Sequence, residues 1–217
     1  MVVAAWDEAT AWQADNSESP FRFASQLVAA WSCLWTIGDR KILDRGLLGL
    51  LCSSRCPGDT ILRTYDLARA LRDARTAVIG GFHSPMEQEC LDFLLRGNQP
   101  LVVCPARAIQ GMRLPAAWRN PIEQGRLLVL SPFSGANRRP TLGLAEKRNR
   151  LVAELARRVF VAHAAPGSKT EALCREMHTL GKELWTFENS LTPTMQTLGM
   201  RGFPSVRLII ETLDQEA

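Results

Sequence analysis

Short apolar runs alternate with longer amphipathic segments through most of this 217-residue chain. The runs are too short for buried helices, and the segments between them repeat their apolar residues at helical spacing. Near-continuous apolar strands separated by helices are typical of a parallel sheet that is covered on both faces. The sequence therefore predicts an α/β, Rossmann-like fold with a mostly parallel sheet. The predicted strands are residues 47–52, 77–80, 101–104, 127–130, 159–162 and 184–187, with 206–210 as a further strand. The predicted helices lie near residues 58–74, 85–96, 115–124, 141–156 and 168–180.

The N-terminal residues differ from this pattern. Residues 1–20 are polar and acidic, and residues 21–35 carry apolar side chains at helical spacing. We therefore predict a small helical extension over residues 1–33, followed by one Rossmann-type domain over 34–217.

Several classes of protein are disfavoured by composition. No apolar run reaches the roughly 18 residues that a membrane span needs, and no secretory signal precedes the domain. The six cysteines are scattered and form no C-x-x-C pair, which indicates reduced thiols rather than a metal site. We therefore expect a cytoplasmic protein with no membrane partner, no metal and no cofactor.

Positive charge is concentrated in one part of the chain. The net charge is +4, but residues 101–150 contain nine basic and only two acidic side chains. Such a local field favours anionic partners such as nucleotides or nucleic acid. A basic but merely solvated face is the alternative.

The turns that follow the predicted strands are the places where such sheets bind ligands. Ser53, Ser54 and Arg55 follow the first strand, and small hydroxyl residues beside an arginine suit a phosphate. The sequence is not a dinucleotide fingerprint, and an ordinary strand-to-helix turn is the alternative.

The second turn contains two glycines and a helix start. Gly80 and Gly81 permit close approach of a ligand to the backbone, and Phe82 and His83 follow them. Ser84 begins a capping box that Glu87 completes.

Two later turns add further basic residues. Arg107 follows the third strand. Phe133, Arg138 and Arg139 follow the fourth, a combination in which a ring stacks on a base while guanidinium groups hold the backbone of a single strand. The alternative is a basic loop with Phe133 tucked into the core.

The turn after the fifth strand reads Gly167, Ser168, Lys169 and Thr170. The spacing of a P-loop, G-x-x-x-x-G-K-S/T, is absent, so ATP hydrolysis is not predicted. A glycine and hydroxyl side chains at a helix start still form a good anion site.

The helical segment 141–156 carries the triplet Arg148, Asn149 and Arg150. Guanidinium groups are planar, permanently charged donors that match phosphate oxygens. No nucleophilic triad, carboxylate pair or histidine cluster accompanies these residues, so we predict no catalytic residues.

Five pieces of the sequence together resemble the DNA-processing protein A (DprA, or Smf) family. Arg148, Asn149 and Arg150, with the strand after them, resemble its R-N-R-I segment, and Ser53 to Arg55 resemble its G-S-R turn. Residues 80–84 stand where the family has S-G-x-A-x-G-I-D, residues 130–133 where it has a serine, an acidic residue and often an aromatic one, and residues 35–39 resemble the lead-in to the domain.

The resemblance implies a homodimer that binds single-stranded DNA in a basic pocket and loads a recombinase during DNA uptake or recombination. The chain departs from the family at Ser53, which replaces a glycine, at Pro132, which replaces an acidic residue, and in the missing G-I-D. Two alternatives come from the wider superfamily. One is a sensor of a nucleotide-derived ligand. The other is a LOG-like phosphoribohydrolase, whose motif is only partly kept at residues 166–170.

Overall fold

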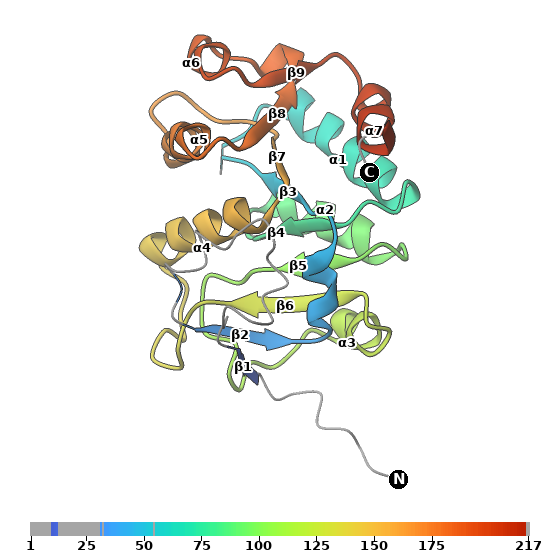
Figure 1. Cartoon of the computed structure of the whole chain (residues 1–217), viewed down its shortest axis with the longest axis vertical. Helices are drawn as coiled ribbons and strands as arrows, with labels where there is room; N and C mark the ends of the chain where they lie inside the picture. The colour runs from blue at the N-terminus through green and yellow to red at the C-terminus, as the bar shows by residue number, and fades with distance from the viewer. Residues whose placement is uncertain (1–9, 13–30, 32, 54, 216–217) are drawn as a thin grey trace.

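The computed structural model describes residues 10–12, 31, 33–53 and 55–215. Nine strands form one sheet in the order β1-β2-β6-β5-β4-β3-β7-β8-β9 (Figure 1). The strands are β1 (Thr10–Trp12), β2 (Leu34–Ile37), β3 (Leu48–Leu51), β4 (Val78–Gly80), β5 (Leu101–Val103), β6 (Leu127–Ser131), β7 (Arg158–Val161), β8 (Glu183–Phe187) and β9 (Arg201–Phe203).

Strands β3 to β9 pair in parallel, whereas β1 and β2 add an antiparallel border beside β6. Strand β3 lies in the interior of the sheet, because Leu48 is in register with Val78 of β4 on one side and with Arg158 of β7 on the other. The chain moves from β3 outward to β6 and then returns to place β7 beside β3. The carboxyl ends of β3 and β7 are therefore the switch point at which such sheets bind ligands.

Helices cover both faces of the sheet (Figure 1). The helices α4 (Leu142–Leu155), α5 (Lys169–Thr179) and α6 (Pro193–Thr197) pack on one face. The helices α1 (Gly58–Asp73), α2 (Pro85–Leu95), α3 (Ala116–Glu123) and α7 (Val206–Gln215) pack on the other. Short 3-10 helices span Arg40–Asp44 and Glu188–Ser190. None of the helices in the described part of the chain has the length and apolar character needed to cross a membrane.

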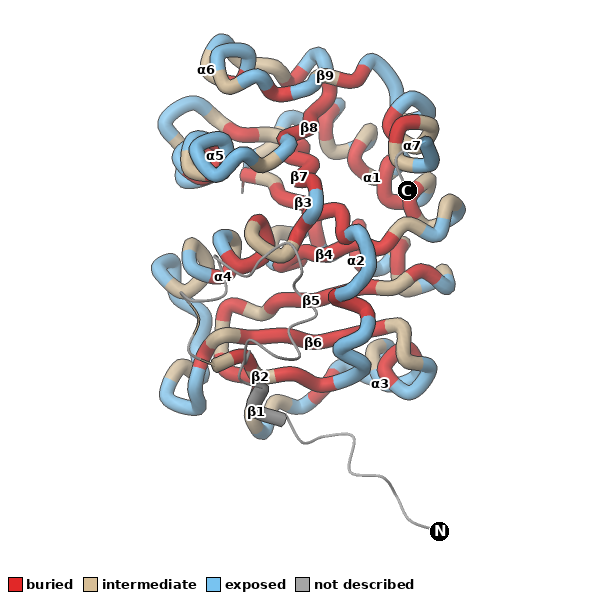
Figure 2. The backbone as a smooth tube through the Cα atoms, viewed as in Figure 1, coloured by how far each residue is buried: buried red, intermediate tan, exposed pale blue. Residues whose placement is uncertain are grey.

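The core has two layers because the central strands are buried on both faces (Figure 2). Successive side chains of a strand point to opposite faces. Leu47 and Leu51 accordingly pack into one apolar cluster, whereas Leu48 and Leu50 pack into the other. This double burial explains why the strands read as continuous apolar runs.

The predicted fold class is confirmed, and the five predicted helices correspond to α1 to α5. Two predictions were wrong. Residues 206–210 belong to α7, because Val206, Ile209 and Ile210 form one apolar helical face, and the final strand is β9. Leu34 and Trp35 lie in β2 rather than at the end of a helix, because the aromatic and β-branched residues that follow Leu34 favour a strand. Within the predicted N-terminal helical extension, residues 1–33, the structure describes only β1, Trp31 and Cys33, and the rest lies outside the described residues. The boundary at residue 33 therefore stays a prediction.

Two leucines of α1 provide a test of this packing. Leu71 is fully buried between α1 and the sheet, whereas Leu62 is 65% exposed. We expect Leu71→Ala to lower the free energy of unfolding by about 2–5 kcal/mol, because the cavity left behind is filled poorly. Leu62→Ala should change it by less than about 0.5 kcal/mol. Urea denaturation of both variants measures the difference, and equal effects would contradict the assigned face of α1.

Candidate functional site at the carboxyl edge of the sheet

The turns after β3 and β7 are fastened to each other at the switch point. The backbone N–H of Ser53 donates to the carbonyl of His163 at 2.9 Å, and the N–H of Ala165 donates to the Ser53 hydroxyl at 3.2 Å. The Ser53 hydroxyl also lies 3.3 Å from that of Ser168. Ser53 is therefore engaged in holding two turns together. Ser54 lies outside the described residues, and Arg55 is exposed beside them.

The start of α5 carries its own anion. The Ser168 hydroxyl accepts from the N–H of Glu171 at 3.1 Å, and the Glu171 carboxylate accepts from the N–H of Gly167 at 2.9 Å. The hydrogen bond from Gly167 lowers the pKa of Glu171. Lys169 pairs with Glu146 at 3.3 Å, and Thr170 is buried. The predicted anion site at this helix start is thus occupied by a side chain of the protein.

The backbone N–H groups at the start of α2 also donate to a carboxylate of the protein itself. Glu87 accepts from the backbone N–H groups of His83 at 3.1 Å and Ser84 at 2.9 Å, and the Ser84 hydroxyl accepts from the N–H of Glu87. The predicted capping box is confirmed. Phe82 adopts a left-handed φ of 45° and folds its ring back over Gly80.

Arg148 lies in the interior, only 3% exposed, although guanidinium groups are rarely buried without a partner. Its Nη1 donates to the carbonyl of Cys104 at 2.9 Å, and its Nε donates to the side chain of Asn149 at 2.7 Å. A Cβ at Gly81 would stand 1.7 Å from Nη1, so only glycine leaves room for this side chain. Burial lowers the pKa of Arg148, and Glu87 opposes that shift. No described carboxylate comes within ion-pair distance of it.

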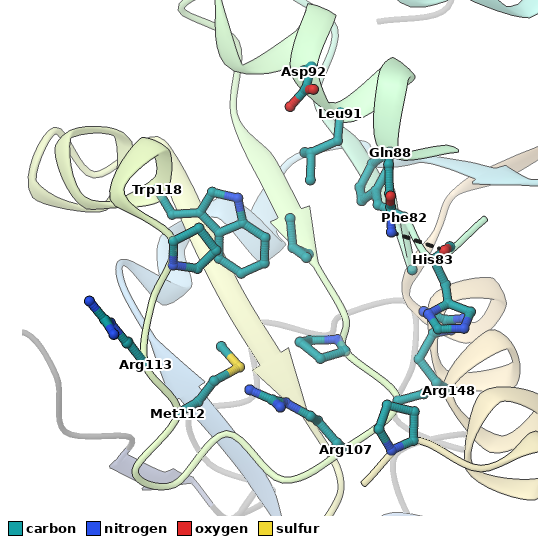
Figure 3. Close-up of a pocket in the computed structure, with 16 residues that line it drawn as sticks. Phe82, His83, Gln88, Leu91, Asp92, Arg107, Met112, Arg113, Trp118 and Arg148 are labelled. Atoms are coloured by element: carbon teal, nitrogen blue, oxygen red, sulfur yellow. Dashed lines mark hydrogen bonds between the residues drawn. The ribbon is translucent and has the colours of Figure 1, made fainter. Parts of the chain in front are cut away.

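Arg148 forms part of the wall of a cavity of about 460 Å³ at the carboxyl ends of β4 and β5. Figure 3 places Trp118, Met112 and Arg113 on one side of it and Gln88, His83 and Arg148 on the other, with Arg107 between them. Gly81, Phe82, Leu91, Asp92, Val103, Pro105, Ala106, Pro115 and Pro140 complete the lining. The walls are therefore apolar with several cationic groups, a composition typical of small-ligand sites.

The predicted site residues separate into three groups. Gly81, Phe82, His83, Arg107 and Arg148 line the cavity together. Arg138 and Arg139 are exposed on the loop after β6, close in sequence to Pro140 at the cavity wall.

The third group, which also includes Ser53, Arg55, Gly80, Ser84 and residues 167–170, does not line the cavity. Phe133 is only 5% exposed, so its ring packs in the protein and offers no open face to a base in this structure. Arg150 pairs with Glu176 of α5 at 2.9 Å, and Asn149 accepts from Arg148. Their predicted role in phosphate binding stays a prediction.

Sequence reasoning missed Met112, Arg113 and Trp118, which lie between β5 and the second turn of α3. Their segment belongs to the basic window of residues 101–150, and an arginine with a tryptophan five residues later was the available signal. The signal was missed because these residues lie well beyond the end of β5, in the part of the chain between β5 and α3 and at the start of α3 that lines the cavity.

No family model and no curated protein matches this sequence. Solved structures nevertheless share its fold. DNA processing protein A from Helicobacter pylori, studied for its single-stranded DNA binding mode, superposes with a TM-score of 0.73 at 19% identity, over 97% of this chain and 98% of that chain. DprA from Streptococcus pneumoniae superposes with a TM-score of 0.74 at 16% identity, over 95% of this chain and 75% of that chain. This chain has the DprA fold.

More distant structures share the sheet and its helices. The molybdenum cofactor carrier protein from Chlamydomonas reinhardtii superposes with a TM-score of 0.55 at 11% identity, over 79% of this chain and 98% of that chain. Proteins of this fold thus include one studied for DNA binding and one that carries a small cofactor. The ligand of this chain must therefore be argued from its own side chains.

The contact between Gly81 and Arg148 gives a direct test. Gly81→Ala should lower the free energy of unfolding by about 1–3 kcal/mol, because the added methyl displaces a buried guanidinium. Gly143→Ala is the matched control, since a Cβ there meets nothing within 4 Å. Alanine favours a helix over glycine by about 0.5–1 kcal/mol, so the control should be stabilised slightly. Denaturant titration measures both, and an unaffected Gly81→Ala protein would contradict the described position of Arg148.

Glu171 predicts a pH dependence of stability. Its pKa is lowered in the folded protein, so its contribution is present above the pKa of the unfolded chain, about 4.3, and is lost as the pH falls through the folded-state pKa. Glu171→Gln should therefore reduce the thermal midpoint at pH 7, and the difference from the unsubstituted protein should shrink toward pH 3. Differential scanning calorimetry across this range measures it; a difference that grows in acid would contradict the assignment.

Proposed function

We propose that this chain is a DprA-like, non-catalytic module that binds single-stranded DNA along the carboxyl edge of its sheet. The observation that carries the proposal is the buried guanidinium of Arg148 at the wall of a basic cavity, with no described carboxylate in ion-pair distance. A buried guanidinium that no carboxylate contacts directly favours an anionic ligand, because a bound anion adds an ion pair that the protein itself does not supply.

The exposed and half-buried arginines around this edge support a chain-like ligand. Arg107 and Arg113 line the cavity, and Arg138 and Arg139 extend the basic surface along the loop after β6. Each guanidinium can hold one phosphate in a bidentate contact. A row of such contacts suits a phosphodiester backbone, and the fold shared with a DNA processing protein A studied for single-stranded DNA binding supports this choice.

A nucleotide-ligand sensor is the second candidate, and the cavity favours it. Its volume of about 460 Å³ matches a site for one small molecule. A sensor would bind one nucleotide tightly and oligonucleotides weakly, whereas a DNA-binding module would bind the oligonucleotide more tightly because it uses the surrounding arginines.

The same proposal includes a homodimer, a recombinase partner and a cytoplasmic location. The six cysteines, all free in the structure, support a reducing compartment. The shared DprA fold supports a role in DNA processing or recombination.

Salt dependence tests the proposed binding. For single-stranded DNA, the logarithm of the affinity falls with the logarithm of salt concentration by about 0.7 for each phosphate contact. Fluorescence anisotropy with a labelled oligothymidine at several salt concentrations measures this slope. The double variant Arg138→Ala, Arg139→Ala should weaken binding and reduce the slope by about 1.4.

Arg157→Ala is the matched control, because Arg157 is an exposed arginine at the amino edge of the sheet. It removes one charge and should leave the slope within experimental error of the original. An affinity that does not respond to salt, or an equal loss in the control, would refute binding at the carboxyl edge.

A further inference from the structure

One wall of the cavity is aromatic and apolar. Trp118, in the first turn of α3, is half-buried. Both Trp118 and Met112 pack against the apolar cluster on the face of the sheet that α3 covers. Both side chains line the cavity, on the same side in Figure 3. A half-buried indole that faces an open cavity presents a flat surface of the kind on which a nucleobase stacks.

The indole N–H of Trp118 has no hydrogen-bond partner among the described residues, unlike that of Trp185, which donates to Glu183 at 2.7 Å. Tryptophan N–H groups in protein interiors usually find an acceptor. A free donor beside an open ring face is therefore available to a ligand that carries both a flat ring and acceptor atoms.

The remaining walls of the cavity supply both cationic and anionic side chains. Arg107 and Arg148 contribute positive charge, and no described carboxylate pairs with either of them. Nη2 of Arg148 has no hydrogen-bond partner among the described residues, since its two hydrogen bonds use Nε and Nη1. Asp92 lies at the far wall from Arg107 and Arg148 (Figure 3) and offers an acceptor for an amino group.

A ligand that satisfies these walls needs a flat heteroaromatic ring at one end and an anion at the other. A nucleoside phosphate has this composition, and the cavity volume of about 460 Å³ lies in the range of small-molecule sites. A simple carboxylate or inorganic phosphate would leave the aromatic wall unused, and an apolar ligand would leave two guanidinium groups unpaired.

We propose that this cavity holds a single nucleotide unit, with its base against Trp118 and Met112 and its phosphate at Arg107 and Arg148. The inference rests on the proposed function in one respect: when the ligand is single-stranded DNA, the unit is one unstacked nucleotide of the strand. The same chemistry is offered by a free mononucleotide, and the experiment below separates the two sources.

Thymidine monophosphate and a short oligothymidine are the two probes, and isothermal titration calorimetry measures their affinities. Trp118→Leu keeps an apolar side chain but removes the ring, so both affinities should fall about tenfold or more. Trp118→Phe restores a stacking surface and should stay within about threefold of the original. Arg119→Ala, which removes an exposed neighbour on α3 outside the cavity, should leave both affinities unchanged.

A second arm of the experiment varies the ligand. In the unsubstituted protein, an abasic nucleotide introduced at successive positions of the oligothymidine should weaken binding at one position, where the base enters the cavity. In Trp118→Leu the same abasic nucleotide should cause no further loss, because the two changes remove one contact. Arg107→Met should weaken both probes, and circular dichroism verifies that each variant is folded.

The outcomes distinguish the two proposals. If the oligothymidine binds with the expected salt slope but Trp118→Leu and the abasic series leave its affinity within twofold, the nucleotide cavity is refuted while DNA binding stands. If thymidine monophosphate binds in a Trp118-dependent way and the oligothymidine does not bind, the cavity is supported and DNA binding is refuted. If neither probe binds, both proposals fail.

Discussion

The guanidinium of Arg148 joins three parts of the chain that are distant in sequence. It reaches from α4 to the carbonyl of Cys104 after β5 and lies against Gly81 after β4. Because the group is buried, it cannot exchange these contacts for water, and the positions of the two turns depend on it. The same burial leaves a charge next to the cavity with no described carboxylate in ion-pair contact. One side chain thus holds the two turns in place and supplies a positive charge at the wall of the cavity.

Helix starts contribute less to anion recognition here than their number suggests. In α2 and α5 the free backbone N–H groups are met by Glu87 and Glu171, which belong to the helices themselves. A ligand phosphate at either place would displace a carboxylate and meet its repulsion. The positions open to an anion are those where arginines reach the edge, around the ends of β4 and β5 and on the loop after β6.

The fold could be predicted from the sequence because its determinants are local. Apolar strands and amphipathic helices repeat along the chain, and the capping box at Ser84 defines the start of α2 correctly. The site was predicted only in part. The turns that follow strands were located, but the partners of each arginine depend on tertiary packing: Arg148 and Arg150 are two residues apart, yet one faces the cavity and the other pairs with Glu176. The burial of Phe133 also depends on tertiary packing, because no local pattern shows whether an aromatic side chain of a loop faces solvent or the core.

Arg113, Arg138 and Arg139 lie on exposed loops, where their side chains are not held by packing. Immobilising each of these long side chains opposes binding through lost rotamer freedom, so any single contact is weak and breaks readily. A polymer that touches several of them at once regains this loss, because each broken contact re-forms at high effective concentration before the whole chain departs. On such a surface, residence time is governed by the length of the bound polymer more than by the identity of any one of its units.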